Sequence, residues 1–205
     1  MGGARSEGPR ERKRVAILRA AVEVFAKRGY PGARMREVAE RAGVADGTLY
    51  LYFRGKEALL IATLEEHAEA FLSRARRDAS RLADPREKLA AVARRHLASL
   101  ERDRELAHVF QIELRHSRRF LRQVALGQLA QYLALIERII RDGTASGHFR
   151  ADVPAEVSAR AVFGAIDELV TGWVLSARPR PLAEQAEPLL RLLLQGLERR
   201  PKGGV

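Results

Sequence analysis

The stretch from Gly43 to Lys56 holds the residues best suited to contact nucleic acid. A hydroxyl, phenols, an ammonium group and exposed backbone N–H groups can all donate hydrogen bonds to base edges or phosphate oxygens. The start of the preceding helix, around Arg34, adds basic side chains. The DNA contacts predicted from these types and positions are Arg34, Met35, Arg36, Asp46, Gly47, Thr48, Tyr50, Tyr52 and Lys56.

A second group that could bind a ligand is a basic cluster further along the chain. It consists of Arg115, His116, Arg118, Arg119 and Arg122, all within eight positions. Guanidinium groups match the geometry of phosphate oxygens, so the cluster could form an anion site beside an apolar pocket. A solvated basic helix face explains the same pattern, and both interpretations stay open at this point.

Metal binding and catalysis have little support in the sequence. The pairs Glu105-x-x-His108 and Glu113-x-x-His116 resemble half-sites of di-iron bundles, but both lie on one predicted helix and cannot converge on one metal pair. The chain has no Cys, which excludes thiolate sites and disulfides. No Gly-x-Ser-x-Gly elbow accompanies the serines and histidines. We therefore predict a protein that is not an enzyme and binds neither metal nor cofactor.

The elements that would position the first group form a helix-turn-helix. Residues 35–42 have helical apolar spacing, and Gly43 suits the left-handed position that ends a helix. A second short helix is predicted from about Asp46, with Leu49 and Phe53 facing the core and its other side facing the major groove. Ala45 cannot cap this helix, so Asp46 or a water molecule is expected to do so.

Helical patterns cover the rest of the chain, and no strand pattern or internal repeat occurs. We predict an all-α fold of about nine helices. One helix precedes the helix-turn-helix and ends near Lys27 to Gly29. The later helices are expected from 55 to about 82, from Pro85 to about 100, through 109–114, and over 118–141, 155–177 and 182–197. These give a flexible arm (1–9), a DNA-binding domain (10–54) and an effector-binding and dimerisation domain (55–205).

Charge is concentrated near the beginning of the 205-residue chain. The net charge is +11, and residues 1–56 hold 13 Lys/Arg against 6 Asp/Glu. A basic field around a helix-turn-helix fits phosphate binding, although a solvated charged surface is the simpler alternative. No run of about 18 apolar residues appears, so we predict no membrane span and a cytoplasmic location.

The segment 155–177 is apolar on nearly all sides, which is typical of a buried helix. Its small residues, among them Ala161, Gly164 and Gly172, would let a partner helix approach closely. We predict that one face packs on its own domain and the other on a second copy, giving a homodimer. The alternative is a central helix of a monomer.

Several of these segments resemble the TetR family of bacterial repressors. The matching residues are Gly43-Val44, Thr48-Leu49-Tyr50, Tyr52-Phe53, Lys56-Glu57 and Leu59-Leu60. The resemblance implies a repressor that binds a roughly palindromic double-stranded operator. It also implies that the last two helices of each copy form a four-helix bundle in the dimer.

A narrower resemblance, to the TetR-type repressors of fatty-acid degradation, rests on segments 43–53, 111–115 and 163–174. It implies that long-chain acyl-CoA is the effector. Leu97, Val109, Phe110, Ile112 and Phe163 are the apolar lining predicted for the acyl chain. The polar candidates are Glu113, Asp167 and, for the phosphates, Arg115, Arg118, Arg119 and Arg122.

Two alternatives remain. One is a drug-efflux type of repressor whose cationic ligand pairs with Asp167, Glu168 and Glu113. The other is a lipid-carrier or enzyme bundle whose basic region only adheres to anions.

Overall fold

The computed structural model describes residues 8–113 and 127–198, and within these ranges the chain is helical without any strand. The helices are α1 (Pro9–Gly32), α2 (Met35–Ala42), α3 (Asp46–Tyr52), α4 (Lys56–Ser80), α5 (Pro85–Glu101), α6 (Arg104–His108), the π-helical turn η1 (Val109–Glu113), α8 (Gln128–Ala145), α9 (Ala155–Leu175) and α10 (Leu182–Leu197). The predicted all-α fold is confirmed. No helix in these ranges is both long and apolar enough to cross a bilayer.

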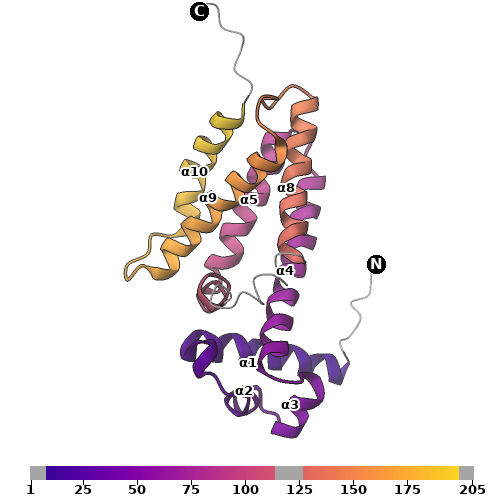
Figure 1. Ribbon diagram of the computed structural model, residues 1–205, viewed down its shortest axis with the longest axis vertical. Helices are drawn as coiled ribbons and strands as arrows, with labels where there is room; N and C mark the ends of the chain where they lie inside the picture. Colours follow the sequence, from indigo (N-terminus) through magenta and orange to yellow (C-terminus); the bar gives the residue numbers. More distant parts are fainter. Residues whose placement is uncertain (1–7, 114–126, 199–205) are drawn as a thin grey trace, which may run out of the picture.

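Helices α1, α2 and α3 form a small head at one end of the molecule (Figure 1). Its core contains Phe25 of α1, Val38 of α2, Leu49 of α3, and Phe53, which directly follows α3. Gly43 ends α2 with φ of 68°, the left-handed conformation that the sequence predicted. Ala45 occupies the N-cap position of α3 without a side-chain cap, as expected for a residue that has no polar side chain.

The regular part of α1 breaks at Gly29, where the sequence predicted the end of the helix. Helical structure continues to Gly32, with a break at Gly29, whose φ and ψ are 68° and 157°. Glycine tolerates this left-handed φ because it has no Cβ. Gly29 therefore ends the regular helix, and a short helical turn to Gly32 follows the kink.

Helix α4 joins the head to the remaining helices (Figure 1). Its first turns place Leu59, Leu60 and Leu64 in the core of the head. Its later turns place Leu72 and Ala75 in the core of the larger bundle. One continuous helix thus contributes to both cores.

The larger bundle is built from α4, α5, α8, α9 and α10, with α6 and η1 crossing at its lower end beside α1 (Figure 1). Among its largest fully buried side chains are Leu89, Ile136 and Ile166. The sequence predicted a regular helix through residues 109–114. In the structure, α6 passes into the π-helical turn η1.

Helix α8 does not end at Asp142 and Gly143, as the sequence predicted, but continues to Ala145. Residues 118–126 of that predicted helix lie outside the described ranges. A Cβ on Gly143 would lie 2.6 Å or less from ring carbons of Phe149 and 3.0 Å from Cβ of Pro85. Gly143 therefore serves a close approach inside the helix, and Gly147, with φ of 77°, makes the turn that follows.

Candidate nucleic-acid interface and ligand-binding interior

Helix α3 is anchored on one side and presents the other side to solvent. Leu49 is fully buried and Phe53 is nearly so, which confirms their predicted orientation toward the core. Tyr50 is 54% exposed and Leu51 is 82% exposed. Large apolar side chains left in water on a short helix are available to pack against DNA bases, including the methyl group of thymine.

The predicted DNA contacts on α3 differ in solvent exposure and in hydrogen bonding within the chain. Asp46 and Gly47 are exposed at the start of the helix, and Thr48 is half-buried. The hydroxyl of Tyr52 donates to the backbone carbonyl of Arg10, at 3.2 Å. Tyr52 therefore connects α3 to the beginning of α1, in addition to its predicted role as a DNA contact.

Lys56 has a structural role that the sequence did not reveal. Its ammonium group donates to the carbonyls of Pro31 and Ala33, at 3.0 and 3.1 Å. It also lies 4.7 Å from the ring centroid of Tyr30, a cation–π contact. The ammonium carries three N–H groups, so the predicted phosphate contact can use the third.

At the start of α2, Arg34 and Arg36 are exposed, and Met35 is half-buried against the head core. Arg36 pairs with Glu40, at 2.9 Å. Within the described part of the head, several exposed basic side chains form no ion pair with a carboxylate. They are Arg10, Lys13, Arg19, Lys27, Arg34 and Arg54. This surplus of positive charge suits a polyanion.

The interior of the larger bundle contains an aromatic cluster contributed by four helices: Phe71 of α4, His96 of α5, Tyr132 of α8 and Phe163 of α9. The ring centroids of Phe71 and Tyr132 lie 5.0 Å apart, edge to face, and those of Tyr132 and Phe163 lie 5.8 Å apart. His96 lies 5.5 Å from Phe71. Flat rings meeting at edges form an apolar wall between the helices.

This cluster includes a buried polar pair. Nδ1 of His96 lies 3.0 Å from the hydroxyl of Tyr132. Burial lowers the pKa of His96 to about 4, so its imidazole is neutral at pH 7. Burial also raises the pKa of Tyr132, which keeps the phenol protonated. His96 and Tyr132 are therefore joined by one hydrogen bond between two neutral side chains.

A second polar chain joins η1 to α9. The amide nitrogen of Gln111 donates to Asp167, at 2.9 Å, and Thr171 donates to the amide oxygen of Gln111, at 3.0 Å. Asp167, one of the predicted effector contacts, therefore has a partner inside the chain. A carboxylate held in this way is less available to a cationic ligand.

The other predicted effector residues fall into different places. Leu97 and Ile112 pack in the larger bundle, whereas Val109 belongs to the core of the head and Phe110 packs against both cores. Glu113 faces the head and accepts a hydrogen bond from the backbone N–H of Tyr30. Arg115, Arg118, Arg119 and Arg122 lie outside the described residues.

A hollow of about 490 Å³ opens between α4 and α8, and it is lined by Glu69, Leu72, Ser73, Arg76, Gln128 and Gln131. Leu72 is the buried apolar residue of this lining and belongs to the core of the larger bundle. Arg76 donates to the amide oxygen of Gln131, at 3.0 Å. The hollow thus combines neutral amides with one carboxylate and one guanidinium.

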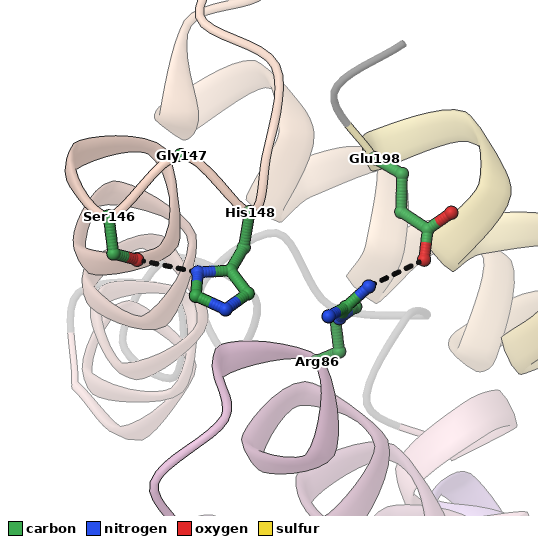
Figure 2. A pocket seen from close by; sticks show the side chains of 5 residues that line it. All are labelled: Arg86, Ser146, Gly147, His148 and Glu198. Atoms are coloured by element: carbon green, nitrogen blue, oxygen red, sulfur yellow. Dashed lines mark hydrogen bonds and ion pairs between the residues drawn. The ribbon is translucent and has the colours of Figure 1, made fainter. Parts of the chain in front are cut away.

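A smaller pocket of about 250 Å³ lies where α8 and α10 end, at the end of the bundle away from the head (Figure 1; close-up in Figure 2). Arg86 and Glu198 face each other across it, 3.4 Å apart, and Ser146 contacts His148, at 2.9 Å (Figure 2). Arg86 is also paired with Asp84. None of the predicted effector residues lines this pocket.

The apolar helix α9 is buried on only one face. Val157 and Leu175 are 55% and 66% exposed, and Leu192 on α10 is 68% exposed. Ala161, Gly164 and Gly172 lie on the same exposed side of α9. A helix central to a monomer would not leave this stripe in water, whereas a second copy could cover it.

Sequence reasoning missed several inward-facing residues: Phe71, His96, Gln111, Tyr132 and Thr171. In the sequence, His96 lies at helical spacing from Leu89, Val92 and Leu100, and a histidine within such an apolar stripe is a signal that could have drawn attention. Nothing in the sequence showed that it would meet Tyr132, because that pairing depends on how α5 and α8 pack. Among the described residues, no three His, Cys, Asp or Glu side chains converge on a possible metal position.

Comparison with known proteins gives two family matches that together run through most of the chain. Residues 17–63 match the bacterial regulatory proteins of the tetR family. Residues 64–196 match the C-terminal region of YsiA-like proteins.

Individual relatives match along nearly their whole length. The fatty acid metabolism regulator protein of Bacillus subtilis (strain 168) is 38% identical over 185 residues, which are 90% of this chain and 95% of that protein. The crystal structure of the transcriptional regulator FadR from Bacillus subtilis, in complex with stearoyl-CoA, has a TM-score of 0.85 and covers 89% of this chain and 98% of its own. The fatty acid degradation regulator FadR from Bacillus halodurans is 36% identical, with a TM-score of 0.87, over 96% of this chain and 100% of its own.

Proposed function

Because the chain belongs to the TetR family of bacterial transcriptional regulators, we propose that it is a homodimeric repressor of fatty-acid degradation genes. In this proposal, long-chain acyl-CoA binds the larger bundle and releases the protein from a palindromic operator in the cytoplasm. The observation that carries the DNA-binding part is the anchored α3, which buries Leu49 and presents Tyr50 and Leu51 to solvent. The chain contributes binding groups and performs no reaction.

In the operator complex, α3 lies in the major groove. Thr48 and Tyr50 contact base edges, and Leu51 packs against thymine methyl groups. Asp46 and Gly47 bring the start of α3 close to the DNA, and Arg34, Met35 and Arg36 flank the groove at the start of α2. Two heads must reach successive major grooves, about 34–36 Å apart or a multiple of that distance.

The dimer forms through the exposed side of α9 together with α10. Val157, Leu175 and Leu192 supply the apolar contacts, and the small residues of α9 permit close approach of the partner helices. This arrangement brings two α3 helices to one side of the operator, which is why the operator has approximate two-fold symmetry.

The acyl chain enters the larger bundle beside the aromatic cluster. The support is chemical: an apolar wall of Phe71, Tyr132 and Phe163 suits an alkyl chain, and His96 with Tyr132 can bond to a thioester carbonyl. The hollow lies between α4 and α8, which contribute Phe71 and Tyr132 to this wall, and its amides suit the amide-bearing arm of coenzyme A. Arg115, Arg118, Arg119 and Arg122 remain the predicted phosphate contacts.

A cationic effector has no comparable support. It would need free carboxylates in the interior, but Glu113 and Asp167 both accept hydrogen bonds from within the chain.

A gel-shift titration tests the effector assignment. Operator DNA is bound by the protein and challenged with coenzyme A, free fatty acid, a short acyl-CoA and a long acyl-CoA. The long thioester is expected to release DNA at a far lower concentration than the others, because each buried CH₂ contributes about 0.8 kcal/mol and free fatty acid lacks the phosphates. Equal potency of all four, or no release by the long thioester, would contradict the acyl-CoA assignment and leave the repressor assignment intact.

A second experiment tests the roles within α3. Thr48→Ala and Tyr50→Ala are expected to reduce the ratio of operator affinity to random-DNA affinity, by roughly tenfold each, since each base contact contributes about 1–3 kcal/mol of discrimination. Binding is measured on the operator and on random DNA at several salt concentrations. A loss that is equal on both DNAs would show that these side chains do not read bases.

A further inference from the structure

Glu113 is a buried carboxylate that connects the larger bundle to the head. It lies in η1 with only 5% of its surface exposed. Its Oε2 accepts the backbone N–H of Tyr30, at 2.5 Å, across 83 positions of sequence. Its Oε1 lies 3.5 Å from Nε2 of His108. A charged acceptor on a backbone donor in a buried site is one of the stronger hydrogen bonds a protein makes.

The bond falls at the kink of α1. Gly29 has the non-helical angles φ 68° and ψ 157°, which break the helix directly before Tyr30. A Cβ on Gly29 would lie 3.5 and 3.8 Å from the two carboxylate oxygens of Glu113, so the carboxylate sits against the kink itself. An interruption of a helix needs new partners for its backbone groups, and here Glu113 supplies one.

Beyond the kink, the contacts lead directly to the reading helices. The ring of Tyr30 packs on Phe25, with centroids 5.9 Å apart, and beneath the ammonium of Lys56. Lys56 in turn donates to the carbonyls of Pro31 and Ala33, which precede α2. The position of Tyr30 therefore helps to fix where the helix-turn-helix sits relative to α4.

The same π-helical turn also contacts the ligand-binding interior. Gln111, two residues before Glu113, is bonded to Asp167 and Thr171 of α9. Phe163, one turn before Asp167 on α9, belongs to the aromatic cluster. One five-residue turn thus holds the interior through an amide and the head through a carboxylate.

We propose that Glu113 is a positioning residue through which the larger bundle sets the orientation of the DNA-binding head. This rests on the proposed function: an acyl chain that displaces the aromatic cluster moves α9 and Gln111, η1 follows, and the Glu113–Tyr30 bond carries that movement to the kink. A ligand lowers DNA affinity only if it binds more tightly to a conformation that does not fit the operator. In this proposal, the Glu113–Tyr30 bond differs between that conformation and the DNA-bound one. Helix α4, which contributes side chains to both cores, shares that role.

Three full-length variants test the proposal. Glu113→Ala removes the acceptor, whereas Glu113→Gln keeps a carbonyl oxygen that can accept the Tyr30 N–H. Glu105→Gln is the matched control, because Glu105 is exposed on the neighbouring α6.

The first measurement needs neither ligand nor DNA. Amide hydrogen exchange of residues 29–34 is compared in the free dimers. Exchange is expected to be about tenfold faster in Glu113→Ala and near wild type in the other two variants. Equal protection in Glu113→Ala and wild type would overturn the proposal, whatever the effector proves to be.

The second measurement gives the coupling. Operator affinity is measured with and without saturating stearoyl-CoA, and stearoyl-CoA affinity is measured on the DNA-free protein. With stearoyl-CoA, the wild-type protein is expected to lose operator affinity by a factor in the usual range of roughly 5–150. The corresponding factor for Glu113→Ala is expected to be at least fivefold smaller. The affinity of Glu113→Ala for stearoyl-CoA is expected to differ from that of the wild type by less than about threefold. Glu113→Gln should restore the wild-type ratio.

The outcomes of this measurement separate the two proposals. An unchanged ratio in Glu113→Ala would overturn the role of Glu113. Absence of any release of the wild-type protein would instead overturn the acyl-CoA assignment, and the exchange measurement would still decide whether Glu113 holds the kink.

Discussion

Replacing Lys56 by methionine separates two roles that one side chain combines. Methionine keeps most of the aliphatic stem and removes the ammonium group. The loss comprises two hydrogen bonds, to Pro31 and Ala33, and the cation–π contact with Tyr30. At a half-exposed site, each hydrogen bond contributes on the order of 1 kcal/mol and the cation–π contact about 0.5–1 kcal/mol. The variant should therefore be less stable by about 2–3 kcal/mol.

Thermal unfolding followed by circular dichroism measures this loss. For a chain of this size, 1 kcal/mol corresponds to roughly 2–4 °C, so Tm should fall by about 5–10 °C at equal protomer concentration. Arg54→Met is the matched control, because Arg54 is exposed close by in the sequence and forms no hydrogen bond or ion pair with any described residue. That control should change the stability by less than about 0.5 kcal/mol.

Operator binding then reports the second role. If Lys56 also contacts a phosphate, Lys56→Met should lower the slope of log affinity against log salt by about one, equally on operator and random DNA. An unchanged Tm in Lys56→Met, or an equal fall in Arg54→Met, would refute the structural role assigned to the ammonium. An unchanged salt slope would refute the phosphate contact.

Two further predictions concern stability. Gly143→Ala should destabilise the protein by about 1–2 kcal/mol in urea unfolding, because overpacking against Phe149 outweighs the gain in helix propensity. The control Gly196→Ala should be neutral or stabilising, because a Cβ there would meet no atom within 4 Å. A stabilising effect of Gly143→Ala would contradict the close approach of Phe149. The pKa of His96 is lowered to about 4 in the folded protein from about 6.5 in the unfolded chain, so the unfolded state binds the proton first as the pH falls. Stability should therefore be complete above about pH 6.5 and decline toward pH 4, by up to about 1.4 kcal/mol per pH unit and protomer. His96→Phe should flatten that decline, and an identical pH profile in the variant would show that another group causes it.

The sequence was sufficient for the head because local signals act there. Gly43 suits the left-handed residue that ends α2, and the spacing of Leu49 and Phe53 determines which side of α3 is buried. These features depend on neighbours within a few residues, so the bounds of α2, the start of α3 and the buried face of α3 were predicted correctly. The helical segments of the larger bundle follow from the same periodicity.

The interior of the larger bundle could not be predicted to the same degree. The bond between His96 and Tyr132 depends on the packing of α5 against α8, and no local pattern encodes that register. Gly143 illustrates the same point, since a glycine after an aspartate is a usual helix end, but its missing side chain makes room for Phe149. Glu113 was assigned to the effector as a polar residue within the resembling segment 111–115, although its carboxylate faces the head.

The shared core of the head affects how the protein could be recombined with others. Leu59, Leu60 and Leu64 of α4 and Val109 of η1 fill the same core as Phe25 and Leu49. A chimera that joined residues 1–54 to a foreign sensor would leave that core without part of its packing. A transplanted head should therefore carry α4 through Leu64, and the recipient should supply an apolar residue in place of Val109. Specificity for a new operator and response to a new ligand can be combined only where that shared packing is preserved.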